Sequence, residues 1–131
     1  MSNPCDAVHF LIGTPPGEGL VLILVEPISF WGGVCSETGA VIDTFHPQFG
    51  ASLAGRIVYM PVSKGSTAGP GALLELIYAG LAPAAIITPE PDLAVLTAAC
   101  MAQALGVPVP AIGTGRPVTV EAGSERPTSI S

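Results

Sequence analysis

The chain has 131 residues, about the size of one domain, and a net charge of −6 with only four Lys and Arg residues. A nucleic-acid interface needs clustered basic residues, so this charge excludes nucleic acid as a partner. No apolar run reaches the length of a membrane span and no signal-peptide pattern opens the sequence. We therefore expect no membrane partner and a cytoplasmic location.

Charged residues make up 11% of the chain and hydrophobic residues 49%. Such a charge-poor surface indicates either a face covered by a partner or a small Ala-rich core with Gly and Pro loops. The cysteines, Cys5, Cys35 and Cys100, show no CxxC spacing, so we expect neither a disulfide framework nor a metal site. Three thiols also cannot hold an ordinary four-cysteine iron–sulfur cluster. Cys100 lies in an apolar helical pattern and is predicted to be a buried small hydrophobe.

The first half of the chain is predicted to be rich in short strands. A short strand is expected over 8–12. The nearly unbroken aliphatic run over 20–26 predicts a strand that is buried on both faces. Residues 40–43 are predicted to form another short strand, and residues 46–55 an irregular connection.

The second half alternates strands with helices, which indicates a compact mixed α/β fold. In chain order we predict a strand over 56–60, a helix over 72–79 ended by Gly80, a buried strand over 84–88, and a helix over 93–105 capped by Asp92 and ended by Gly106.

Prolines dominate the segment that follows the second helix. Residues 107–112 are predicted to be an edge-like extended segment because proline cannot donate to a ladder. Residues 117–121 are predicted to be a last strand and 123–131 a polar, frayed tail. With no repeat or linker in the sequence, we expect a single domain over 1–131 with its core at about 8–122.

The most polar stretch lies between the strand predicted over 56–60 and the helix predicted over 72–79, and it holds the only lysine, Lys64. N–H groups at a helix start attract negative charge. Together with Lys64 they would lower the cost of an alkoxide at Ser66, which is our candidate nucleophile or base. The alternative is that Ser66 or Thr67 only caps the helix. The stretch is neither a Walker A loop nor a G-x-S-x-G elbow.

Two other features leave alternatives open. His46 could join Ser66 and Asp43 in a catalytic triad, or it could hold a turn by hydrogen bonding. Trp31, which precedes two glycines, could line a pocket or belong to the core.

Three stretches taken together resemble the small subunit of aconitase X enzymes. The resemblance spans roughly residues 20–112 and is carried by 29–34 with 37–39 and 42–43, by 46–47 with 50 and 53–56, and by 64–67 leading to 73–77.

This resemblance implies a swivelling β/α domain, similar to the mobile domain of aconitase, that closes over a large subunit holding an iron–sulfur cluster. No cofactor would be bound by this chain alone. In aconitase-like enzymes a Gly-Ser-Ser-Arg loop supplies the catalytic serine, and Gly65 and Ser66 match its first two positions. Thr67 replaces the second serine, and Ala68 stands in place of the arginine. The implied substrate-binding residues are Ser63, Lys64, Gly65 and Thr67.

The resemblance also implies a reaction. Ser66 would remove the proton α to a carboxylate, while the iron–sulfur centre of the large subunit polarises the leaving hydroxyl as a Lewis acid. Our first hypothesis is dehydration of cis-3-hydroxy-L-proline, a small carboxylate, to Δ1-pyrroline-2-carboxylate in a heterodimer or higher assembly. The alternatives are dehydration of mevalonate 5-phosphate, a non-catalytic anion-binding module, and a lone serine hydrolase. We expect the chain to fold alone and to expose an apolar face.

Overall fold

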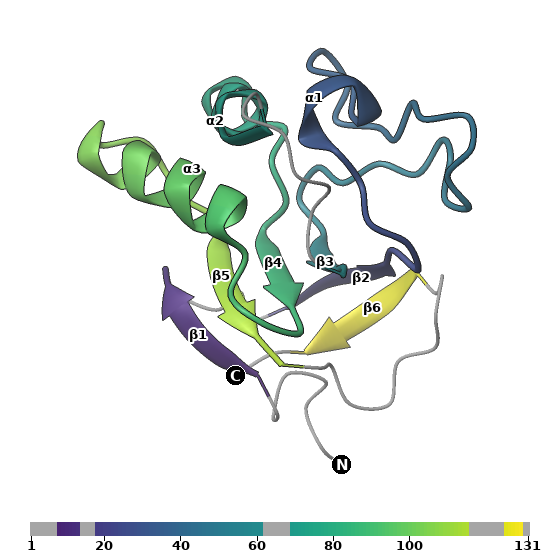
Figure 1. Cartoon of the computed structure of the whole chain (residues 1–131). Helices are drawn as coiled ribbons and strands as arrows, with labels where there is room; N and C mark the ends of the chain where they lie inside the picture. The colour runs from purple at the N-terminus through teal and green to yellow at the C-terminus, as the bar shows by residue number, and fades with distance from the viewer. Residues whose placement is uncertain (1–7, 14–17, 62–68, 116–124, 130–131) are drawn as a thin grey trace.

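The computed structural model describes residues 8–13, 18–61, 69–115 and 125–129. Within these ranges it contains six strands and three helices (Figure 1). They are β1 (His9–Ile12), β2 (Glu18–Ile23), α1 (Phe30–Gly33), β3 (Ile57–Tyr59), α2 (Gly69–Ala79), β4 (Ala85–Thr88), α3 (Leu93–Ala104), β5 (Ala111–Thr114) and β6 (Glu125–Ser129).

All six strands belong to one sheet with the order β1-β5-β4-β3-β2-β6. The inner strands β2, β3, β4 and β5 are parallel to one another, and the edge strands β6 and β1 pair antiparallel with β2 and β5. Each crossover from β2 through β5 moves one strand in the same direction, so right-handed connections put all three helices on one face. Figure 1 shows α1, α2 and α3 together above the sheet.

The inner strands are buried on both faces. Leu22, Val58, Ile86 and Ile112 lie in register and pack into the main core beneath the helices. Their neighbours along each strand point to the other face and form a second apolar cluster: Val21, Ile23, Ile57, Ala85, Ile87 and Ala111. This alternation follows from the two-residue period of a strand. The prediction of burial on both faces is confirmed for residues 21–24.

The end of α2 and the beginning of α3 are as predicted, whereas α2 begins at Gly69, before the predicted start at residue 72. Gly80 adopts a φ of +74° after α2, and the N–H of Leu81 donates to the carbonyl of Leu76 at 2.9 Å, which closes the helix. Asp92 caps α3, since its Oδ1 accepts from the N–H of Val95 at 3.2 Å. Gly106, with a φ of +75°, follows the end of α3.

Cys100 is exposed rather than buried, so that prediction was wrong. The buried stripe of α3 is Val95, Ala98, Ala99 and Ala102. Residue 100 is one step of about 100° beyond Ala99 on a helix, which turns its side chain away from the core.

Two of the strands predicted in the first half differ in the structure. The strand over 20–26 is shifted, since β2 runs from Glu18 to Ile23 and Val25 is exposed. The strand predicted over 40–43 was wrong. Ala40 and Val41 form only isolated bridges, to Ser52 and Val34, in a hairpin outside the sheet.

The C-terminal part differs most from prediction. Residues 111–114 form β5, an inner strand between β4 and β1, so the edge-like assignment of 107–112 was wrong. Pro108 and Pro110 precede the ladder, which starts where the N–H of Ala111 donates to the carbonyl of Ala84 at 3.0 Å. The strand predicted over 117–121 lies outside the described residues. Part of the expected frayed tail forms β6, because antiparallel pairing with β2 uses backbone groups whatever the side chains are.

Candidate functional site

The predicted catalytic segment lies where β3 gives way to α2. Its residues Ser63, Lys64, Gly65, Ser66 and Thr67 all fall outside the described residues. The structure does fix both ends of the segment. Met60, directly after β3, donates its N–H to the carbonyl of Ile87 at 2.9 Å, and α2 begins at Gly69.

This junction is at the carboxyl edge of the parallel strands. The residues after β2, β3 and β4 all leave the sheet at that edge, because these strands run in the same direction. In open α/β sheets ligands bind outside the carboxyl ends of the strands. The predicted strand before the segment and the predicted helix after it are therefore confirmed, whereas Ser66 and its neighbours lie outside the described residues.

Thr88 ends β4 at the same edge and is buried. Its hydroxyl donates to the carbonyl of Glu90 at 2.6 Å, and its own carbonyl accepts from the N–H of Gly115 at 2.9 Å. Thr88 thus shapes the turn after β4 and leaves no free hydroxyl proton for substrate.

His46 is 5% exposed and uses both ring nitrogens. Its Nδ1 accepts from the N–H of Gln48 at 3.0 Å, which requires the ring proton to be on Nε2. The Nε2 atom lies 3.0 Å from the carbonyl oxygen of Glu26 and therefore donates to it. The interpretation of His46 as a turn-holding residue is confirmed.

The proposed triad fails at this residue. A general base needs a free ring nitrogen, and both nitrogens of His46 bind backbone groups. Asp43 is also engaged, because its Oδ1 accepts from the N–H of Phe45 at 3.0 Å. A lone serine hydrolase built on His46 and Asp43 is therefore excluded.

Gln48 is a structural residue that the sequence did not reveal. Its side-chain Oε1 accepts from the N–H of Val25 at 3.1 Å. With His46 it ties the loop over 43–50 to the residues that follow β2. The sequence does not indicate this contact, because a glutamine at this position has no recognisable motif and its partner is a backbone group 23 positions away.

Trp31 is 65% exposed, so the core interpretation of this residue was wrong. It has a strand-like backbone conformation within α1 (φ −86°, ψ 116°), and Gly32 follows with a φ of +83°. That positive φ favours glycine, although a Cβ at Gly32 would meet no atom within 4 Å. The hydroxyl of Ser29 donates to the carbonyl of Trp31 at 2.8 Å and stabilises the turn. The turn thus presents the indole at the surface.

Cys35 lies in the hairpin after α1 and is half-buried. A hydrogen bond from the hydroxyl of Thr38, supported by the backbone N–H groups of Glu37 and Thr38, holds the pKa of the Cys35 thiol below its ordinary value. The N–H of Gly39 donates to the carbonyl of Cys35 at 2.8 Å and closes the turn.

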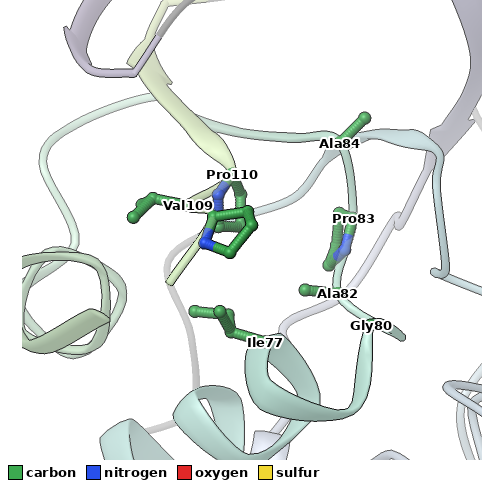
Figure 2. Close-up of a pocket in the computed structure, with 8 residues that line it drawn as sticks. Ile77, Gly80, Ala82, Pro83, Ala84, Val109 and Pro110 are labelled. Carbon is green, nitrogen blue, oxygen red and sulfur yellow. The ribbon is translucent and has the colours of Figure 1, made fainter. Parts of the chain in front are cut away.

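An apolar pocket of about 230 Å³ lies at the opposite, amino edge of the sheet (Figure 2). It opens between the end of α2 and the segments that precede β4 and β5. None of its lining side chains carries a polar group: Ile77, Gly80, Ala82, Pro83, Ala84, Pro108, Val109 and Pro110. A carboxylate substrate needs polar partners, so this pocket is not the site of the predicted chemistry.

Over the described ranges, no group of three or more His, Cys, Asp or Glu side chains is arranged to hold a metal ion. In the same part of the chain, no helix combines the length and apolar character that crossing a bilayer requires.

Comparison with known proteins identifies the fold family. Residues 11–125 match the family described as Aconitase X swivel domain. The crystal structure of Thermococcus kodakaraensis aconitase X (holo-form) is similar, with a TM-score of 0.70 and 34% identity over 84% of this chain and 80% of that chain.

Two curated relatives are also similar. The cis-3-hydroxy-L-proline dehydratase of Pseudomonas aeruginosa is 40% identical over 104 residues, which are 77% of this chain but only 18% of that protein. The phosphomevalonate dehydratase small subunit of Methanothermobacter thermautotrophicus is 40% identical over 99 residues, 76% of this chain and 73% of that protein. The chain belongs to the aconitase X swivel-domain family.

Proposed function

We propose that this chain is the small, swivelling subunit of a two-subunit aconitase X type dehydratase and is active only with its large subunit. The observation that carries the proposal is the family match over residues 11–125, which includes the loop with Ser66. The described residues on either side of Ser66 support the proposal, because the segment with Ser66 connects β3 to α2 at the carboxyl edge of the parallel strands.

In this proposal Ser66 is the base that takes the proton α to the substrate carboxylate. Ser63, Lys64, Gly65 and Thr67 bind the substrate. Lys64 provides the one positive charge in the loop, and N–H groups at a helix start favour an anion. Both would bind a carboxylate and lower the cost of the serine alkoxide. No histidine of the described residues competes for this role, since both nitrogens of His46 are engaged and His9 lies on the antiparallel edge strand β1.

The partner of the chain is an aconitase X large subunit, in a heterodimer or a higher assembly. Two relatives support this assignment, since one is named a small subunit and the other is a much longer protein in which the similar region is 18% of the length. The iron–sulfur centre belongs to the large subunit in this proposal, because the three cysteines of this chain are fewer than the four thiolates that an ordinary cluster takes. When bound there, such a centre supplies Lewis acidity to a leaving hydroxyl.

The substrate we propose is cis-3-hydroxy-L-proline, with Δ1-pyrroline-2-carboxylate as the product. The name of the Pseudomonas relative supports this choice. Lys64 is the only lysine of the chain. A single ammonium group provides little positive charge for binding a phosphate in addition to a carboxylate, which also favours the smaller substrate. The alternative substrate is mevalonate 5-phosphate, which the name of the Methanothermobacter relative favours.

The test is a dehydration assay of the purified two-subunit complex with each substrate separately. We expect turnover of cis-3-hydroxy-L-proline and none of mevalonate 5-phosphate. The reverse result would reassign the substrate and keep the reaction class. A complex that dehydrates neither compound but binds carboxylates would leave a non-catalytic anion-binding module and refute the dehydratase assignment.

A further inference from the structure

Four large apolar side chains stand exposed on two linked segments, and we call them the docking patch. Phe45 is 94% exposed and Phe49 57% exposed in the loop over 43–50. Trp31 is 65% exposed on α1, and Ile42 is exposed where the hairpin enters the loop. Exposed apolar side chains that gather on linked segments indicate an interaction surface more strongly than isolated ones do.

Backbone hydrogen bonds hold the members of the patch in place. The N–H of Ile42 donates to the carbonyl of Gly33 at 2.9 Å, which joins the loop to α1 two residues after Trp31. Within the loop, the N–H of Phe49 donates to the carbonyl of His46 at 3.0 Å, and the N–H of Gly50 donates to the carbonyl of Val41 at 2.9 Å.

The loop reverses the usual distribution of polar and apolar side chains, because its histidine is buried and its two phenylalanines are exposed. His46 bridges Glu26 and Gln48 through its ring, and Gln48 binds Val25 through its side chain. The aromatic residues are therefore presented by a loop with fixed hydrogen bonds. Pre-organisation of this kind lowers the entropic cost of binding a partner.

The patch also lies at the edge where the predicted site is. Val25 and Glu26, which anchor the loop, lie two and three residues beyond the carboxyl end of β2. That end is adjacent to the carboxyl end of β3, where the N–H of Leu24 donates to the carbonyl of Tyr59 at 2.8 Å. A partner that covers this edge in order to share the site would meet the patch.

We propose that the docking patch is the surface on which this chain binds its large subunit. The inference rests on the proposed function, which supplies the partner. Residues 41–50 hold a single formal charge, Asp43, and its carboxylate already accepts a hydrogen bond from the backbone of Phe45. The complementary surface is therefore apolar, with pockets for the rings of Phe45 and Phe49, and not a charged groove.

The test measures the affinity of this chain for its large subunit. The large subunit is the protein from the same organism whose sequence matches the Pseudomonas dehydratase outside the region that is similar to this chain. We compare wild type with a Phe45→Ser, Phe49→Ser double variant. The control is Leu105→Ser, because Leu105 is 56% exposed, as Phe49 is, but lies at the far end of α3. Urea unfolding of each free variant checks that it folds.

Titration calorimetry should show the double variant binding at least about tenfold more weakly, with Leu105→Ser within about threefold of wild type. Turnover by the double variant should recover at saturating large subunit. The proposal is overturned if the double variant binds like wild type, if Leu105→Ser weakens binding equally, or if the wild-type chains do not associate. A wild-type complex without turnover refutes the proposed function alone, because the affinities still decide the docking patch.

Discussion

His46 is a buried polar residue that stabilises the fold by hydrogen bonding to two backbone groups. The carbonyl of Glu26 and the N–H of Gln48 would each lose their partner without the imidazole. A buried group left without a partner costs more than the bond itself contributed, because its desolvation is no longer offset. The exposed aromatic residues of the same loop contribute little to stability, so the polar contacts must hold the loop in place.

We therefore expect His46→Ala to lower the free energy of unfolding by about 1–3 kcal/mol. Urea denaturation measures this directly. The matched control is His9→Ala, because His9 is exposed on β1 and a surface substitution changes stability by no more than about 0.5 kcal/mol. Equal effects of the two substitutions would contradict the role assigned to His46. His46→Ala should also weaken binding of the large subunit, since it loosens the loop that carries Phe45.

The Cys35 thiol is predicted to react at lower pH than an unstructured cysteine. Hydrogen bonds from Thr38 and from the backbone of Glu37 stabilise the thiolate and lower the pKa, and the thiolate is the reactive form. The alkylation rate of a C5S, C100S variant as a function of pH measures the shift. Thr38→Val should move the midpoint upward, and an unchanged midpoint would refute the assigned cause.

The same lowered pKa has a consequence for stability with a definite sign. The folded state favours the thiolate, so its contribution to the free energy of unfolding is complete above the unfolded pKa. It is lost as pH falls through the folded pKa. The difference in stability between Thr38→Val and wild type should therefore be larger in alkaline buffer than in neutral buffer.

At the scale of elements, two glycines near the ends of α2, Gly71 in its first turn and Gly80 after its last residue, have opposite roles. Gly80 ends the helix at a φ of +74°, where an L side chain is strained even though a Cβ would meet no atom within 4 Å. Gly71 lies in the first turn without a positive φ and also has open space around its Cβ position. Backbone conformation alone therefore separates the two positions.

Gly80→Ala should destabilise the chain by about 1–2 kcal/mol, because alanine at a positive φ brings its Cβ too close to the following carbonyl oxygen. Gly71→Ala should stabilise it by about 0.4–1 kcal/mol, because it reduces the freedom of the unfolded chain. Thermal unfolding of both variants checks the pair of signs. Destabilisation by Gly71→Ala would show that this position needs glycine for another reason.

Elements with a local cause were predictable from sequence. Asp92 before an apolar helical pattern predicts a cap, and Gly80 predicts a helix end, because both effects act over a few residues. The prediction of a strand over 40–43 failed because two β-branched residues, Val41 and Ile42, do not indicate which segment they pair with. Strand β6 was missed because the backbone of β2 pairs with it, and a polar sequence such as 125–129 carries no hydrophobic alternation.

The site was predictable in part. Motif resemblance indicated the loop with Ser66, and the structure confirms the strand before it and the helix after it. The contacts of His46 and Gln48 to residues 25–26 were beyond sequence reasoning, because they join backbone groups 20 or more positions away. The exposure of Trp31 was also undetermined, since an aromatic beside glycines fits a core or a surface equally well.

At the scale of the whole molecule, the carboxyl edge of the parallel strands gathers the features that suggest function. The loop with Ser66 leaves β3 there, and the loop with Phe45 is anchored there beside β2. The apolar pocket lies at the other edge and is lined by side chains without polar groups. This arrangement suits a domain that completes its site by closing one edge onto a larger partner.

We propose that Ser66 of this chain is the base of an active site shared with the large subunit. The most direct test is kcat of the purified two-subunit complex on cis-3-hydroxy-L-proline with Ser66→Ala in place of wild type. We expect kcat to fall by about 10²–10⁴-fold while the affinity for the large subunit is unchanged, because loss of a general base removes that much rate. Ser36→Ala, an exposed serine in the hairpin, is the control and should keep the wild-type kcat. A Ser66→Ala complex that retains the wild-type kcat would show that Ser66 is not the base.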